Sequence, residues 1–403
     1  MQDFTSLFLE FSKDFESPTS FWKWSSYALI AATLRDNVFH NQGNEIICPN
    51  IYVILLADSA VFRKGGSFPI ISELIETLHH TKLFDGRASI QALMERLSVD
   101  LGGKKGIPIR GGSCLLLAEE LSSFFVYDPQ LIPLMTNLYR SRKTFNYELR
   151  GNAFTIKDLC VTLLGASNET LLREIFDIKA TEGGLLGRTF VIKPDKKRPA
   201  NDLLEIDLAR YNKKPLINSL EEIKKLKGPI TFTKPAARRY KEWYKELYES
   251  LEKTYDPTGM LGRIHTSVLK LCMIQAASNY RLEITEEDVV TSIEDAICLK
   301  PNYEAFAMSS GMSNQAKIGS IFLKALWETS ILNGNNGNKM SRKIFLQNFW
   351  NQMSAEDLDK VTQTLVQGGL ILEDLSGNDL GYIMTQKCRE KFEGKLKGKK
   401  TNP

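Results

Sequence analysis

The fold of this chain is decided by the stretch Asn50-Ile51-Tyr52-Val53-Ile54-Leu55-Leu56-Ala57-Asp58-Ser59-Ala60-Val61-Phe62-Arg63-Lys64-Gly65-Gly66-Ser67. Its residues 51–56 form an apolar run, which is typical of a strand buried on both faces of a parallel sheet. A short loop with two cations follows, and residues 68–75 have the pattern of a helix start, with Ser67 as its cap. Strand, lysine loop and helix is the layout of a phosphate-binding loop, in which N–H groups and a lysine face phosphate oxygens.

The loop departs from the usual pattern G-x-x-x-x-G-K-[ST]. Ala57 replaces the first glycine, Arg63 replaces the glycine before Lys64, and Gly65 replaces the hydroxyl residue that binds magnesium. We expect Lys64 to neutralise nucleotide phosphates with assistance from Arg63. The alternative is an ordinary loop at the end of a buried strand. The candidate nucleotide-binding residues are Asp58, Ser59, Arg63, Lys64, Gly65, Gly66 and Ser67.

The composition is that of a soluble globular protein. The 403 residues suffice for two or three domains, and 43% of them are hydrophobic and 25% charged. No apolar run approaches the ~18 residues of a membrane helix, and the N-terminus lacks the pattern of a secretory signal. The six cysteines are scattered, so we expect reduced thiols, a cytoplasmic protein and no membrane partner.

Positive charge is concentrated at the C-terminus. The net charge is +4, and residues 385–403 are rich in Lys and Arg. This tail either touches phosphates or only keeps the chain soluble.

A second candidate motif is a pair of carboxylates after an apolar run. Residues 113–118 have the pattern of a buried strand, and Glu119 and Glu120 follow directly. This suits a Walker B element, in which the first acid, Glu119, holds Mg²⁺ and the second, Glu120, polarises the attacking water. Alternatively, both are exposed acids at the start of a helix.

A hairpin follows, with basic residues around it. Residues 144–149 and 153–156 alternate in polarity around a Gly-Asn turn. Arg142, Lys143 and Arg150 are the candidate DNA-binding residues of this hairpin.

Two more polar residues stand at strand ends. Residues 159–165 have the pattern of another buried strand, and Asn168 follows it, where an amide can sense a γ-phosphate. Arg188 comes immediately before a further apolar strand, 189–192.

The C-terminal half is mostly helical. Residues 193–229 are rich in Lys, Pro and Asn and are expected to be a linker, and a capping signal at 285–288 precedes the last helix of the segment 233–296. Residues 315–395 then predict three helices and a hairpin, which is the pattern of a winged helix. Such modules bind DNA or protein, and the acidic hairpin does not favour DNA.

Taken in order, these motifs look like the core and lid of an AAA+ ATPase. Residues 185–190 resemble a stretch of the minichromosome maintenance (MCM) helicases whose arginine, Arg188 here, reaches a neighbouring subunit's nucleotide. Residues 262–296 resemble the lid of that family, whose first arginine, Arg263 here, acts as sensor 2. The hairpin at 144–156 stands where those helicases carry a DNA-contacting hairpin. The front half is also similar to P-loop proteins of phages and mobile elements that carry an Arg-Lys-Gly loop and are often fused to primases.

The resemblance implies an α/β fold: a P-loop core with a parallel sheet, a helical lid and a C-terminal winged helix. It implies ATP and Mg²⁺ as cofactors and a DNA helicase of a mobile element that forms a ring, as a hexamer, with a primase or replication initiator as a possible partner. The alternatives are a non-hydrolysing nucleotide-binding scaffold, loader or regulator, and an unrelated DNA-binding regulator. The expected parts are a helical preface (1–45), the core (46–228), the lid (229–306), the winged helix (313–395) and the basic tail (396–403).

Overall fold

The computed structural model describes residues 2–58, 61–86, 89–100, 109, 111–121, 130–149, 151–175, 184–201, 211–251, 258–303, 314–332, 339–349, 353–375 and 379–390. The chain forms two compact units, Met1–Ala307 and Met308–Pro403, and each has an apolar core of its own. Ser59 and Arg150, which the sequence analysis singled out, lie outside the described residues.

The first unit is built on a parallel sheet with the strand order β4-β5-β7-β3-β8. Its strands are β3 (Tyr52–Leu56), β4 (Lys82–Phe84), β5 (Ser113–Ala118), β7 (Asn152–Ser167) and β8 (Thr189–Ile192). All five residues of β3 are buried, because strands flank it on both sides and helices cover its faces. The predicted buried strand and the α/β class with a parallel sheet are confirmed.

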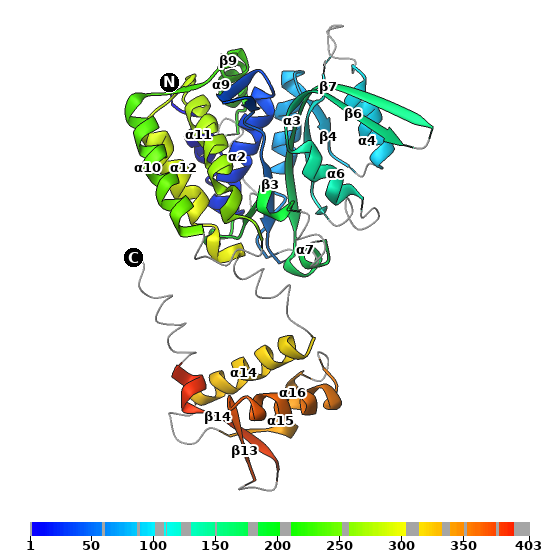
Figure 1. The fold of residues 1–403 in the computed structure, drawn as a ribbon, viewed down its shortest axis with the longest axis vertical. Coiled ribbons are helices and arrows are strands. Elements are labelled where there is room, and N and C mark those ends of the chain that lie inside the picture. The colour runs from blue at the N-terminus through cyan, green and yellow to red at the C-terminus, as the bar shows by residue number, and fades with distance from the viewer. Residues whose placement is uncertain are drawn as a thin grey trace. The chain divides into compact units, whose positions relative to one another are not determined.

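Helix α2 (Thr19–Leu34) is the centre of the first unit's helical layer (Figure 1). Thirteen of its sixteen residues are buried, since residues 21–34 are apolar or small apart from Lys23. It packs on the sheet and on α1 (Phe4–Phe11), α3 (Phe68–Leu78) and α9 (Lys214–Lys225). The helices of the N-terminal segment therefore contribute to the apolar core of the first unit.

Helix α9 occupies much of the expected linker, so that expectation is wrong for this part. Leu216, Leu220 and Ile223 lie on one side of the helix and are buried against the N-terminal helices. Their spacing is a helical stripe within a segment whose lysines and prolines suggested a linker.

Strand β7 runs through the whole first unit. It pairs antiparallel with β6 (Arg142–Leu149) to make the predicted hairpin, and then continues between β5 and β3 to Ser167. The hairpin arm and the buried strand that the sequence suggested separately are thus one strand of 16 residues. Figure 1 shows it running from the projecting hairpin to α7 (Glu169–Ile175). Helices α4 (Ile90–Ser98) and α6 (Leu131–Leu138) also lie beside the sheet.

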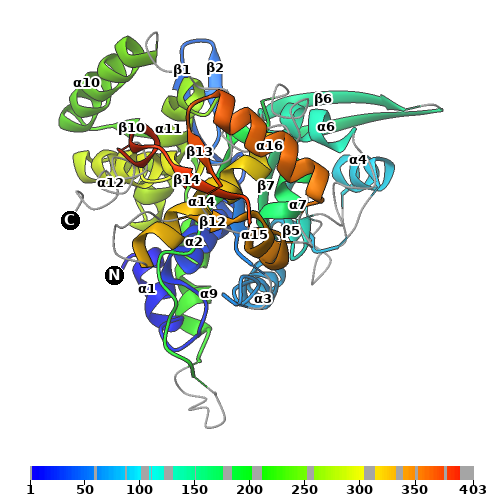
Figure 2. The ribbon, with the colours of Figure 1, turned by 90° about the horizontal axis from the view of Figure 1, so that it is seen from below.

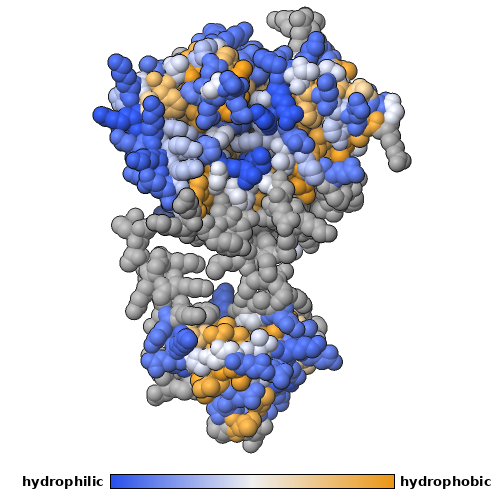
Figure 3. All heavy atoms as spheres, in the orientation of Figure 1, coloured by the Kyte–Doolittle hydropathy of each residue, from blue (hydrophilic) through white to orange (hydrophobic). Residues whose placement is uncertain are grey.

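The helices of the expected lid share one apolar core with the sheet. They are α10 (Lys234–Leu251), the short η3 (Leu261–Arg263), α11 (Ile264–Ser278) and α12 (Glu286–Ile297). The predicted cap is confirmed, because Thr285 and Asp288 form a reciprocal capping box at the start of α12. Helix α10 and the hairpin lie at opposite ends of the sheet (Figures 1 and 2), and hydrophilic side chains cover the outer side of α10 (Figure 3).

Short strands complete the first unit. They are β1 (Val38–Gln42), β2 (Glu45–Ile47) and β9 (Gly228–Pro229) in one sheet, and β10 (Thr231–Phe232) and β11 (Glu283–Ile284) in another.

In its described residues the second unit has three helices and a three-stranded antiparallel sheet of order β12-β14-β13. Its elements are α14 (Asn314–Leu332), β12 (Met340–Ser341), α15 (Arg342–Phe349), α16 (Ala355–Gln367), β13 (Ile371–Asp374) and β14 (Gly381–Met384). The rings of Phe322, Phe345 and Tyr382 meet in its core. The predicted helices and hairpin are present, and β12 adds a third strand.

Candidate functional site

The carboxyl ends of the central strands bring the predicted motifs to one edge of the sheet. The lysine loop follows β3, the paired acids follow β5, and Asn168 follows β7. Leu56 pairs with Ser167 and Ala118 pairs with Gly165, so the three strands end at nearly the same level. Neighbouring strands lie about 4.8 Å apart, which places β5 about 10 Å from β3 across β7. One ligand can therefore span the lysine loop and the acids.

Lys64 presents an unsatisfied charge in this loop. Its Nζ is buried and has no hydrogen-bond partner in the part of the chain that the structure describes. Helix α3 begins at Phe68 directly after the loop, and it has neither a side-chain cap nor an acidic residue in its first turn. The N–H of Phe68 donates to the carbonyl of Gly65 and Pro69 has no N–H, so the unpaired ammonium and the positive end of the helix dipole are what favour an anion here. The residues present therefore fit a phosphate group.

The side chain of Arg63, unlike that of Lys64, has a partner in the structure. It has a positive φ of 45°, and its Nε lies 3.0 Å from Oε2 of Glu16. This hydrogen bond, together with one from the backbone N–H of Asn201, lowers the pKa of the Glu16 carboxyl. Arg63 is thus held by the N-terminal segment.

The hydroxyl of Ser67 is already engaged. Ser67 is buried, and its Oγ lies 2.8 Å from Oγ of Ser25 in α2. Ser67 is the N-cap residue of α3, as predicted, but its side chain does not cap the helix. Ser59 and Ser67 are the hydroxyl residues among the candidate nucleotide-binding residues. The hydroxyl of Ser67 is bonded to α2, and Ser59 lies outside the described residues.

The polar residues after β5 and β7 differ in their surroundings. Glu119 is exposed, as is Asp58 after β3, whereas Glu120 is partly buried. Asn168 Oδ1 accepts a hydrogen bond of 2.9 Å from the backbone N–H of Leu171, which leaves its Nδ2 group as the donor for a phosphate oxygen. Among the described residues no three His, Cys, Asp or Glu side chains form a metal cluster, so Glu119 would meet Mg²⁺ together with water or phosphate oxygens.

Arg188 lies at the opposite edge of the sheet. It ends the short helix η2 (Leu186–Arg188), and the next residue, Thr189, pairs with Tyr52 at the amino end of β3. The five residues of β3 separate Arg188 from the lysine loop by about 16 Å at ~3.3 Å per residue. That distance exceeds the reach of an arginine side chain, so Arg188 does not serve the Lys64 loop of its own chain.

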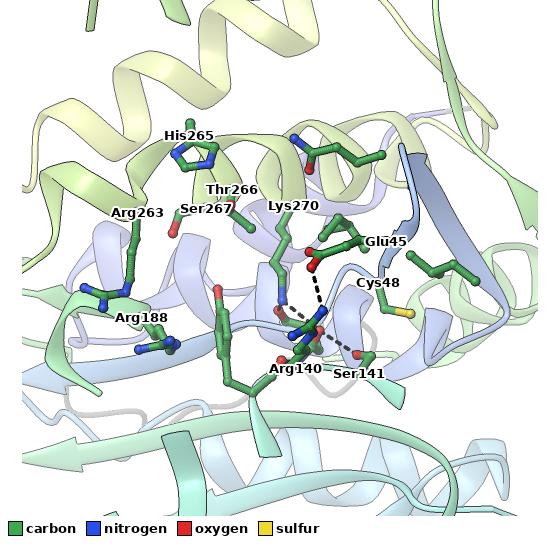
Figure 4. A pocket seen from close by; sticks show the side chains of 15 residues that line it. Glu45, Cys48, Arg140, Ser141, Arg188, Arg263, His265, Thr266, Ser267 and Lys270 are labelled. Atoms are coloured by element: carbon green, nitrogen blue, oxygen red, sulfur yellow. Dashed lines mark hydrogen bonds and ion pairs between the residues drawn. The ribbon is translucent and has the colours of Figure 1, made fainter. Parts of the chain in front are cut away.

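Arg263 lies beside Arg188, as Figure 4 shows. A Cβ added to Gly184 would be 2.9 Å from Nη1 of Arg188 and 3.0 Å from Nη2 of Arg263. Arg188 Nη1 donates to the carbonyl of Gly184 at 2.7 Å, and Arg263 Nη1 donates to the carbonyl of Gly259 at 3.0 Å. Neither has an ion pair within the described ranges. Burial and the charge of Arg263 lower the pKa of Arg188, as expected for cations that face no anion.

The two arginines line a cavity of about 460 Å³ that continues to Lys270. The Nζ of Lys270 lies 2.8 Å from both the backbone oxygen and Oδ1 of Asn50, and 3.9 Å from the ring centre of Tyr139. Burial lowers the pKa of Lys270 to about 8. Sequence reasoning missed this residue, whose signal was a lone lysine inside the apolar run 268–274. Arg140, also at the cavity, pairs with Glu45 at 2.5 Å.

The hairpin carries less free charge than its sequence suggested. Lys143 lies 3.3 Å from Asp158 and 3.5 Å from Asp36. Burial alone would lower its pKa, but these carboxylates outweigh burial and raise the pKa of Lys143. Arg142 is exposed over the ring of Phe145, 5.3 Å from its centre. Arg142 is therefore the better placed of the two for a nucleic-acid phosphate.

No protein-family model matches the chain, and no curated protein is significantly similar to it. None of the helices in the described ranges is long and apolar enough to cross a membrane.

Proposed function

We propose that this chain is an ATPase of the AAA+ type that assembles into a ring and acts on DNA. The observation that carries the proposal is the buried, unpartnered Nζ of Lys64 beside the N-terminus of α3. Two acids and Asn168 stand at the same edge of the sheet, on the next strands.

In this proposal each side chain has one task. Lys64 neutralises the β- and γ-phosphates, Glu120 polarises the attacking water, and Asn168 donates its amide to the γ-phosphate. Mg²⁺, held by Glu119, would offset the charge that develops on the phosphate oxygens. The proposed nucleotide is ATP.

The ring is proposed because two arginines lie at the amino side of the sheet, too far from the lysine loop of their own chain to reach it. Arg188 and Arg263 converge at the cavity on the amino side of the sheet, and neither has a carboxylate partner among the described residues. A neighbouring copy would offer its nucleotide to them, as the resemblance to the MCM helicases implies. A hexamer is the proposed assembly.

DNA is the proposed substrate, through the projecting hairpin and Arg142. The helices of 229–306 would act as the lid and the second unit as the winged helix. By resemblance, the chain would serve a mobile element together with a primase or replication initiator.

The test is ATP turnover with and without DNA, over a range of protein concentrations. We expect DNA-stimulated activity per chain that rises with concentration, because the arginines act only in an assembly. Glu120→Gln should abolish turnover and keep binding, and Lys64→Ala should lose both. Glu76→Gln on the exposed side of α3 is the control and should behave as wild type. Activity per chain that stays constant down to the dilute monomer would contradict the ring.

A second candidate is a scaffold that binds nucleotide without hydrolysis. It is favoured by Gly65, which has no hydroxyl for magnesium, and by Ser67, whose hydroxyl is bonded to Ser25. Nucleotide binding without turnover, whether or not DNA is present, would support it.

A further inference from the structure

A buried hydroxyl outside the lysine loop lies directly against it. Ser17, between α1 and α2, is 2% exposed, and its Oγ has no hydrogen-bond partner within the described residues. A Cβ added to Gly66 would be 3.4 Å from Cβ of Ser17 and 3.8 Å from its Oγ. Ser17 is therefore packed on the loop two residues after Lys64.

The segment around Ser17 is held in place by bonds that do not involve its hydroxyl. Arg198 donates to the carbonyl of Phe15 at 3.2 Å and to Oγ1 of Thr19 at 3.0 Å. Glu16 accepts from Arg63 on one side and from Asn201 on the other. The position of Ser17 beside Gly66 is thus fixed by its neighbours in the chain.

An unsatisfied buried hydroxyl is costly, so its persistence needs an explanation. Two unsatisfied donors, Ser17 Oγ and Lys64 Nζ, belong to the same small region of the structure. A phosphate group offers only acceptor oxygens, which are the partners that both donors lack. The loop itself lacks a hydroxyl at Gly65, and that of Ser67 is engaged by Ser25.

We propose that Ser17 supplies, from the N-terminal segment, the hydroxyl that the phosphate-binding loop lacks, and that it contacts the phosphate end of a bound magnesium nucleotide. This inference rests on the proposed function, since it assigns a further residue to the same nucleotide site. It gives the segment between α1 and α2 a role in binding as well as in packing.

The experiment titrates ADP and ATP with Mg²⁺ into the full chain by calorimetry and measures thermal unfolding without nucleotide. Ser17→Ala should weaken binding about tenfold, the loss expected for one hydrogen bond to a charged group. Its melting temperature should stay the same or rise, because the hydroxyl has no partner to lose. Ser12→Ala is the matched control: Ser12 is buried in the same segment, and its Oγ donates to the carbonyl of Leu9 at 3.0 Å. It should lower the melting temperature and leave affinity unchanged.

Lys64→Ala separates the two proposals. If wild type binds nucleotide, Lys64→Ala does not, and Ser17→Ala binds as wild type does, the Ser17 inference is wrong and the proposed function stands. If Ser17→Ala loses affinity only in step with a lower melting temperature, its role is structural and the inference is overturned. If wild type itself binds no nucleotide, both proposals fail. The titration is repeated without Mg²⁺: a loss of affinity in Ser17→Ala that persists supports a donor to phosphate, and a loss that appears only with Mg²⁺ overturns it.

Discussion

Arg63 is the residue whose role depends most on the bound state. Its Nε bonds to Glu16 in the structure, whereas the proposed role requires its guanidinium to face the phosphates. We expect Arg63→Ala to weaken ATP binding by about 1–3 kcal/mol, the range for a charge-assisted contact. Glu16→Gln should strengthen binding, because it releases the guanidinium. Nucleotide titrations of both variants beside wild type measure this. Wild-type affinity in Arg63→Ala would mean that Arg63 serves only to hold Glu16.

His80 makes the stability of the fold sensitive to acid. Its Nε2 lies 3.4 Å from Nδ2 of Asn37, which fits a neutral ring that accepts a hydrogen bond. Burial, and then the charges of Arg35, Lys224 and Lys227, lower the pKa of His80 to about 3. The unfolded chain takes up this proton near pH 6.5, so the stability that the neutral ring contributes is lost as the pH falls from about 6.5 toward 3.

The His80 effect is measured by urea unfolding between pH 7.5 and 5. Below pH 6.5 wild type should lose up to about 1.4 kcal/mol per pH unit from this group, and His80→Gln should show a smaller slope. Equal slopes in the two proteins would show that His80 titrates normally in the folded state.

At the scale of elements, the contact between η2 and the segment before η3 sets the two arginines side by side. A Cβ on Gly187 would lie 2.6 Å from the carbonyl oxygen of Gly259 and 2.8 Å from its carbon. Gly187→Ala must therefore push these segments apart, at a cost of about 1–3 kcal/mol. We expect ATP turnover to fall at temperatures where the variant is still folded, because the arginines are displaced. Nucleotide binding at Lys64 should remain.

Gly262→Ala is the control for Gly187→Ala, because a Cβ at Gly262 meets nothing within 4 Å. Melting temperature, nucleotide titration and ATP turnover are compared in the two variants. A Gly187→Ala protein with wild-type turnover would show that the placement of the arginines is unimportant.

The hairpin offers a test of the DNA proposal. Asp158 has a φ of 52°, a conformation that asparagine also tolerates, and its carboxylate holds Lys143. Asp158→Asn should release charge on Lys143, strengthen DNA binding and steepen its salt dependence. Arg142→Ala should weaken DNA binding and reduce the slope of log affinity against log salt concentration by about one. If neither variant changes DNA affinity, the hairpin does not contact DNA.

At the scale of the molecule, the two units have separate apolar cores. We expect a chain ending at Ala307 to fold, to keep its melting temperature and to bind nucleotide as the full protein does. A chain ending at residue 228 should not fold, because the helices beyond it share the core of the sheet. Calorimetry of the full chain and both truncations measures this. An insoluble 1–307 fragment would contradict the independence of the units.

Local patterns in the sequence predicted what lies close together along the chain. Strand β3, its loop and the start of α3 were found because alternation, buried runs and turn residues act over a few positions. Partners distant in sequence were not found. Ser67 bonds to Ser25, 42 residues away, and Lys270 bonds to Asn50, 220 residues away. Sequence spacing does not predict such pairs, because only tertiary packing brings the two residues together.

Strand β7 joins the hairpin to the edge of the sheet that carries the lysine loop by one unbroken backbone. At ~3.3 Å per residue its 16 residues span about 50 Å, and hydrogen bonds to β3 and β5 keep its inner part from stretching. The backbone of β7 therefore links the hairpin directly to Asn168, and Asp158 within this strand has a positive φ of 52°. Under the proposed function, β7 would connect the hairpin that contacts DNA to the site where the phosphate is hydrolysed.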